Sequence, residues 1–240
     1  MHCEIVVREA TSRDMEARAE LVRRAVTEYD LDAFLLFFFQ ELTLQVCVLC
    51  GAVLFIFVGA GLWACAAVLP AAAAAVALCV LVAHRALAER HVQRMRQEAR
   101  GFVAEYRGPL LAEPAAAALR MPVLLQSGAR GPGAAHARVV GTVSVSECWG
   151  PQRAGWLHAL SVAPGWRRRG AGAALLAAVR AHAAREGLEA LEAVASELQG
   201  AARCLLHAAG WETRGSYARP LLGAALALHV SRLALQLPHA

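Results

Sequence analysis

Lysine is absent from this sequence, so all 24 of its basic residues are arginine and the formal net charge of +5 comes from arginine alone. We attribute this partly to coding bias. A basic balance suits a membrane surface, nucleic acid or an anionic cofactor equally well, so the charge by itself excludes none of these partners.

We also expect no secretory signal peptide in residues 1–32, because they carry charges throughout and no cleavage site follows a short apolar core. We therefore do not expect the seven cysteines to form a disulfide framework. Cys47 and Cys50 have CxxC spacing, but no second pair or nearby histidine accompanies them in the sequence. The sequence therefore predicts no metal site.

Charge is missing altogether from residues 42–83, within a chain that is 58% hydrophobic and has a mean hydropathy of +0.44. As a helix this run would be about 63 Å long, twice the roughly 30 Å of a bilayer core. Gly59–Gly61 and Pro70 can divide it into two passes, over 42–58 and 62–83.

We therefore predict a transmembrane or re-entrant helical hairpin over residues 33–84. Arginines flank it on both sides, which favours a cytoplasmic location for both ends. A buried hairpin in the core of a soluble protein is the alternative.

The rest of the chain alternates between strand and helix patterns. The expected strands cover 5–10, 121–126, 139–146, 156–163 and 188–194, and the expected helices cover 14–29, 84–106, 170–185 and 199–209. The helix over 84–106 is polar and is expected near a membrane surface. The tail over 221–237 is either a last strand or a helix resting on the membrane.

The most informative stretch is Leu157–Leu176, which reads as a strand, an arginine-rich turn and an apolar helix. A glycine-rich turn that opens a helix directs several backbone N–H groups and the positive end of the helix dipole to one point. This arrangement predicts a phosphate site. A solvated basic turn that merely caps a helix is the alternative.

Two motifs, together with the order of the expected strands and helices, resemble the GCN5-related N-acetyltransferases (GNAT). Arg167–Gly172 matches that family's [Q/R]-x-x-G-x-[G/A] signature after the strand Leu160–Val162, and Gly210-Trp211 lies where the family has glycine followed by an aromatic residue. The apolar block resembles the camello branch of membrane N-acetyltransferases, and the lysine-free Trp-Arg-Arg-Arg-Gly-Ala-Gly form is similar to the probable N-acetyltransferase fourteen branch.

The resemblance implies an α/β (α+β) fold with a mixed, mostly antiparallel sheet and flanking helices, interrupted by the hairpin. Residues 1–32 would be its first strand and helix, 33–84 the hairpin and 85–240 the remainder. Both parts must then lie on one side of the bilayer, because a single crossing would separate them. The location implied is an internal membrane such as the endoplasmic reticulum, with the catalytic domain in the cytoplasm.

The resemblance also implies acetyl-CoA as cosubstrate. The residues expected to cradle its pyrophosphate are Arg167, Arg168, Arg169, Gly170, Ala171, Gly172 and Ala173. Backbone groups of Leu160 and Val162 would face the pantetheine arm. The available catalytic groups are Glu147, His158, His207 and Tyr217.

Leu206 lies where many family members have a tyrosine that protonates the departing thiolate. The function that the resemblance implies is membrane-anchored acetyl transfer to an amino-acid conjugate, a small amine or a protein lysine. The alternatives are a CoA-binding or scaffold protein without catalysis and, on charge alone, a DNA-binding regulator. The expected partners are acetyl-CoA, an amine and membrane lipid, but not nucleic acid.

Overall fold

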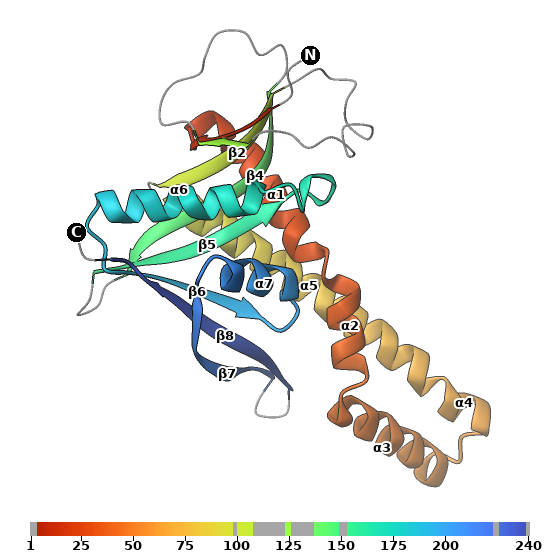
Figure 1. Cartoon of the computed structure of the whole chain (residues 1–240). Coiled ribbons are helices and arrows are strands. Elements are labelled where there is room, and N and C mark those ends of the chain that lie inside the picture. Colours follow the sequence, from red (N-terminus) through yellow and green to blue (C-terminus); the bar gives the residue numbers. More distant parts are fainter. Residues whose placement is uncertain are drawn as a thin grey trace.

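One eight-stranded sheet forms the centre of the protein (Figure 1). The computed structural model describes residues 4–97, 100–107, 123–125, 137–148, 153–222 and 226–238. The strands are β1 (Glu4–Glu9), β2 (Gly101–Arg107), β3 (Val123–Leu125), β4 (Ala137–Cys148), β5 (Ala154–Val162), β6 (Ala190–Ser196), β7 (Glu212–Leu222) and β8 (Leu226–Gln236).

The strand order is β3-β1-β2-β4-β5-β6-β8-β7. β1 with β3 and β5 with β6 are parallel, and the other neighbours are antiparallel. The expected mixed, mostly antiparallel sheet is therefore confirmed.

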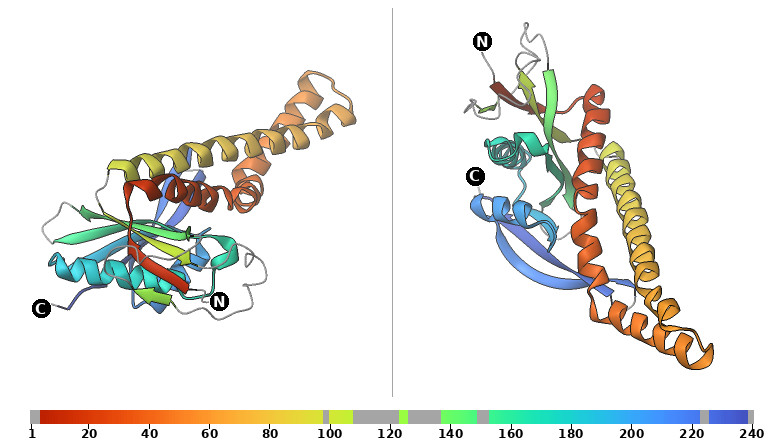
Figure 2. Two further views of the ribbon diagram at one scale, coloured as in Figure 1. Left: turned by 90° about the horizontal axis from the view of Figure 1, so that it is seen from above. Right: turned by 90° about the vertical axis from the view of Figure 1, so that its right-hand side faces the viewer.

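Helices cover both faces of this sheet. They are α1 (Met15–Thr27), α2 (Asp30–Phe38), α3 (Glu41–Phe57), α4 (Leu62–Ala66), α5 (Val68–Gln97), α6 (Ala171–Arg185) and α7 (Gly200–Ala208), with short 3-10 turns at Ser12–Asp14 and Pro164–Trp166. Figure 2 shows α6 on one face and α1 with α5 on the other.

The main core lies between the sheet and α6, where Leu175, Leu191 and Leu233 are fully buried. Each such side chain contributes about 1.5–3 kcal/mol by leaving water. A smaller core joins α1 to the end of α5 through Val22 and Met95.

The prediction of a helix over residues 84–106 is wrong at both ends. Instead, α5 runs from Val68 through this region to Gln97, and its last turns pack on α1 rather than lying free near a membrane surface. Residues 101–107 form β2, because Phe102, Ala104 and Tyr106 enter the main core at the two-residue period of a strand.

Most of the tail over 221–237 forms β8, so the expectation of a last strand is confirmed and the helix on the membrane is wrong. β8 pairs with β6 from Ala190↔Gln236 to Ser196↔Val230, and β7 pairs with β8 at the edge of the sheet. The sequence pattern did not predict β7, which begins at Glu212.

An ion cluster fixes the start of α1 to the sheet. Arg8 on β1 donates hydrogen bonds to Asp14 at 2.7 and 2.9 Å and to Glu105 on β2, and all three side chains are buried. Burial alone would raise the pKa of Asp14, but hydrogen bonds from Arg8 and Thr11 hold it well below its usual range. The Asp14 carboxylate therefore stays charged and keeps α1 in place.

Residues 30–83, which we name the apolar arm, project away from the sheet (Figures 1 and 2). All strongly exposed large apolar side chains of the described residues, apart from Leu87 and Tyr217, lie in it. The arm is therefore not a buried hairpin of the core. By length and composition, helix Leu62–Gln97 could cross a membrane, and the bent pair Ser12–Phe38 and Glu41–Phe57 would make a second span if counted as one.

The arm begins and ends beside the same sheet. β1 precedes it, β2 follows it, and the two strands pair from Glu4↔Arg107 to Glu9↔Phe102. At the base of the arm, His84 of α5 contacts Asp30 of α2 through its Nδ1 atom. The chain therefore leaves the sheet domain at β1 and returns to it at β2, on the same side of any surface that the arm contacts.

Candidate functional site

The sheet opens between β5 and β6. Their parallel ladder has four pairs, from Ala154↔Ala190 to Leu157↔Ala193, and then stops. Beyond it β5 continues along β4 to Val162, whereas β6 continues along β8 to Ser196. The two strands therefore diverge as a V, as Figure 1 shows, and among the described residues no other strand fills it.

A β-bulge in β5 lies at the apex of this V. Between the pairs Thr142↔Ser161 and Ser144↔His158, β5 has one residue more than β4. Ala159 takes up the extra residue with a φ of 53°, in the left-handed region that non-glycine residues rarely adopt. Strained backbone of this kind concentrates at functional sites.

At the open end of the V, β5 passes into the turn predicted to hold a phosphate. Arg168 has a φ of 61° and Gly170 a φ of 83°, and α6 begins at Ala171. The first helical hydrogen bond runs from the Ala174 N–H to the Gly170 carbonyl at 2.9 Å, so the preceding N–H groups of the helix have no acceptor within it. These groups can bind an anion.

The three arginines of the turn have different surroundings. Arg167 donates to the Val162 carbonyl at 3.0 Å and binds the Glu28 carboxylate through both terminal nitrogens. Arg169 lies over the ring of Trp166, 5.0 Å from its centroid, and Arg168 is exposed. The sequence pattern predicted all three at a phosphate, but the guanidinium of Arg167 is held by Glu28.

Gly172 serves helix packing in this structure. A Cβ atom there would lie 2.8 Å from a methyl group of Leu205 on α7. A larger residue at this position would therefore have to displace the Leu205 side chain. A phosphate contact by the backbone of Gly172 stays a prediction.

Two imidazoles lie on the α5 side of the V. His158, 7% exposed, is the first residue of β5 beyond the ladder. His91 of α5 is half-buried, and burial lowers its pKa below the ordinary value near 6.5, helped by electrostatic interactions with His158, Arg94 and Arg219. The sequence pattern singled out His158 but not His91, whose place depends on how α5 packs.

The other predicted catalytic groups lie elsewhere. Glu147 is exposed and pairs with Gly155, three residues along β5 from His158, a separation of about 10 Å along the strand. His207 makes contacts at the end of α7, with its Nδ1 atom 3.0 Å from the Trp211 carbonyl. Tyr217 is half exposed on β7. The structure does not bring these three groups together with His158.

Leu206 is buried in the main core, 2% exposed. The resemblance implies a tyrosine at this position, but Leu206 packs in the core and cannot donate a proton.

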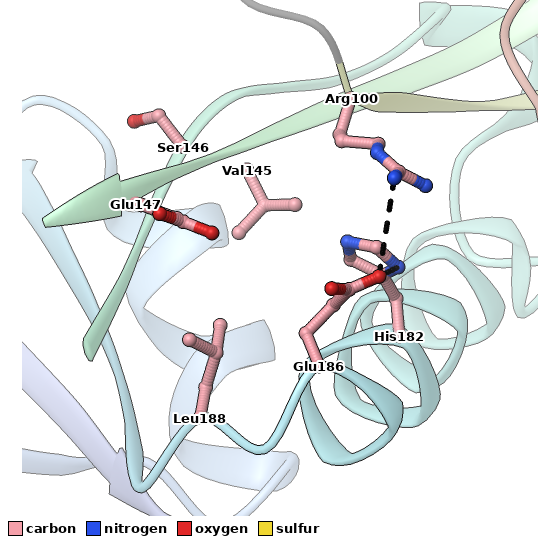
Figure 3. A pocket seen from close by; sticks show the side chains of 7 residues that line it. All are labelled: Arg100, Val145, Ser146, Glu147, His182, Glu186 and Leu188. Atoms are coloured by element: carbon pink, nitrogen blue, oxygen red, sulfur yellow. Dashed lines mark ion pairs between the residues drawn. The ribbon is translucent and has the colours of Figure 1, made fainter. Parts of the chain in front are cut away.

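A pocket of about 240 Å³ lies at the other end of α6 (Figure 3). In it, Glu186 lies 3.9 Å from the Nδ1 atom of His182 and 4.0 Å from Arg100, with Glu147 on the opposite wall. Because α6 has 15 residues, this pocket is about 22 Å from the turn. Its carboxylates and the negative end of the helix dipole make it unsuitable for a phosphate.

In the part of the chain that the structure describes, no group of three histidine, cysteine or acidic side chains is arranged to hold a metal ion. The arrangement instead suits an elongated ligand. Such a ligand would place an anionic group at the turn, lie along the unpaired edge of β5 and reach His158 at the apex of the V.

Comparison with known families points to the same region. Residues 114–211 match the acetyltransferase (GNAT) family, and the match includes β4, β5, the turn, α6, β6 and α7. No curated protein matches the sequence significantly.

Two solved structures resemble nearly the whole chain. One is yncA from Salmonella typhimurium, solved with its cofactor acetyl-CoA, at 15% identity and a TM-score of 0.50 over 98% of this chain and 95% of that one. The other is an N-acetyltransferase from Staphylococcus aureus Mu50, at 12% identity and 0.49 over 98% and 99%. At these sequence identities the similarity concerns the fold alone. Of the two structures, only yncA has a TM-score high enough to support a similar fold.

Proposed function

We propose that this chain, whose residues 114–211 match the acetyltransferase (GNAT) family, transfers the acetyl group of acetyl-CoA to an amine while its apolar arm anchors it to a membrane. The observation that carries the catalytic part is the junction of the open V with the turn at the start of α6. Acetyl-CoA has the matching shape, with phosphates at one end and a thioester at the other.

The turn supplies the contacts that a pyrophosphate requires. The N–H groups at the start of α6 and the positive end of its dipole favour negative charge, and the exposed Arg168 adds a cation. Backbone groups of Leu160 and the N–H of Val162 can hydrogen-bond the pantetheine arm, because no described strand pairs with β5 on that edge. The Val162 carbonyl already accepts a hydrogen bond from Arg167. The thioester would then lie near the bulge at Ala159.

Transfer requires a neutral amine whose nitrogen attacks the thioester carbonyl. A C–N bond forms, the C–S bond breaks, the amine loses one proton and the CoA thiolate gains one. We assign removal of the amine proton to His158, because it lies at the apex of the V on the α5 side. With Leu206 in the core, the proton for the thiolate comes from solvent or from the protonated base.

The buried Leu206 also supports a second candidate, a protein that binds acetyl-CoA without transferring its acetyl group. Purified protein with labelled acetyl-CoA and a panel of amino acids, small amines and peptides separates the two. Acetylated product supports the enzyme, whereas tight binding without transfer supports the second candidate.

The proposal for the arm rests on its exposed side chains. A monomeric soluble protein rarely exposes so large an apolar surface, and a bilayer would cover it. Since β1 and β2 pair across the arm, it would enter and leave the membrane on one side as a helical hairpin. We further propose the cytoplasmic face of an internal membrane and the camello branch, on the strength of the flanking arginines and the position of the arm.

Gly170→Glu tests the cofactor site. The substitution forces a non-glycine residue to a φ of 83° and adds a carboxylate beside the proposed pyrophosphate, so we expect at least a 100-fold loss of acetyl-CoA affinity by calorimetry. Gly200→Glu, at the start of α7 where a Cβ meets no atom within 4 Å, is the matched control. Unchanged affinity in Gly170→Glu would show that the turn does not bind the cofactor.

His158→Ala tests the proposed base. We expect kcat to fall about 10²- to 10⁴-fold with the Kd of acetyl-CoA little changed, because general base catalysis contributes that much. His229→Ala, which alters an exposed histidine on β8, should retain wild-type kcat. Full activity in His158→Ala would exclude this assignment.

His91 predicts a loss of stability in acid. Burial lowers the pKa of His91 below its ordinary value of 6.5, so the folded protein takes up a proton there less readily than the unfolded chain, and the free energy of unfolding should fall as the pH drops below about 6.5. In His91→Gln, the drop in thermal midpoint between pH 7.5 and pH 5.5 should be smaller than in the wild type. An equal drop in both proteins would contradict this role of His91.

If the arm is the anchor, the protein should stay with the membrane fraction during a wash with alkaline carbonate. Phe55→Glu, Phe57→Glu and Trp63→Glu together should release the protein, because each charge costs about 3 kcal/mol within the bilayer. Ala181→Glu, Ala184→Glu and Ala201→Glu, all at exposed helix positions, form the matched control and should stay bound. If the arm variant stays in the membrane fraction, the arm is not the anchor. In a separate protease-protection assay, tags at the two termini that lie on opposite sides of the bilayer would contradict the hairpin.

A further inference from the structure

We propose that Glu28 is a positioning residue for the cofactor turn, which it holds through Arg167 at the junction between α1 and the apolar arm. The inference rests on the proposed function, because it concerns the affinity of that same turn for acetyl-CoA. Glu28 lies 139 residues from Arg167 in the sequence.

The contact is a two-point ion pair. The Nη1 atom of Arg167 donates to Oε1 of Glu28 at 2.7 Å, and Nη2 donates to Oε2. The Nε atom of the same guanidinium donates to the Val162 carbonyl at 3.0 Å. The arginine therefore ties the last residue of β5 and the end of α1 to the first residue of the turn.

The charges agree with this arrangement. A hydrogen bond from Arg167 lowers the pKa of Glu28, and the same bond raises the pKa of Arg167, although burial of each side chain opposes the shift. Both side chains are 37% exposed, so the pair contributes little to global stability. Its consequence is local, because planar two-point geometry fixes direction as well as distance.

The turn needs such support. Arg168, the next residue, has a φ of 61° in a region that side chains disfavour, and Gly170 follows in the same region. Without a partner for Arg167, this backbone would relax among other conformations, and binding of a phosphate would have to order it again. Glu28 therefore acts on cofactor affinity by preorganisation, without contacting the cofactor.

The position of Glu28 adds a link to the arm. Its N–H donates to the Arg24 carbonyl at the end of α1, and α2 begins two residues later at Asp30. A second tie runs from the Ser161 hydroxyl on β5 to the Leu21 carbonyl. The end of α1 thus contacts the arm on one side and the turn on the other.

Glu28→Gln in the full-length protein tests this role, because it removes the charge and keeps the shape. We expect the KM and Kd for acetyl-CoA to rise about 3- to 10-fold, with kcat within twofold of wild type and the thermal midpoint nearly unchanged. Glu20→Gln is the matched control, since Glu20 forms an exposed ion pair with Arg24 on the same helix. It should leave both constants unchanged.

A double-mutant cycle provides the decisive comparison. Arg167→Gln should weaken acetyl-CoA binding at least as much as Glu28→Gln, and the combined variant should be no worse than Arg167→Gln alone. Additive losses, or wild-type affinity in Glu28→Gln while Gly170→Glu abolishes binding, would overturn the role of Glu28. Unchanged affinity in Gly170→Glu as well would instead show that the proposed cofactor site is wrong.

Discussion

The early end of the ladder between β5 and β6 is the constraint on which the rest of the site depends. After Leu157↔Ala193 each strand follows a different neighbour, so hydrogen-bonding groups on the facing edges remain available inside a folded sheet. Buried backbone groups need partners, and a bound ligand with amides along its length can supply them. The same divergence places His158 at the apex and the turn at the opening.

The second constraint is the pairing of β1 with β2 across the apolar arm. Because β1 before the arm pairs with β2 after it, the two parts of the chain belong to one sheet and lie on the same side of any surface that would cover the arm. The ion cluster around Arg8 and the packing of α5 on α1 fix the base of the arm to the sheet. The proposed membrane anchor and the proposed cofactor turn then meet at one place, the end of α1.

Local signals in the sequence predicted the strand, turn and helix around Gly170, since glycine spacing and apolar periodicity act within a few residues. Long-range packing decided what the sequence could not predict. The strand at Gly101 replaced a helix because its side chains fill a core made by distant elements. His91 and Glu28 gained partners only through the folding of α1 and α5 against the sheet. The bulge at Ala159 has no sequence signal, because alanine is an unusual residue for that conformation.

Hydrogen exchange of the full-length protein, with and without acetyl-CoA, tests the central claim most directly. The account predicts slower exchange of the amides from Arg168 to Ala173 and of the edge of β5 beyond Leu157 when acetyl-CoA is added. The region around Arg100 and Glu186, at the far end of α6, should exchange at an unchanged rate. Protection confined to that far pocket, with none at the turn, would contradict the account.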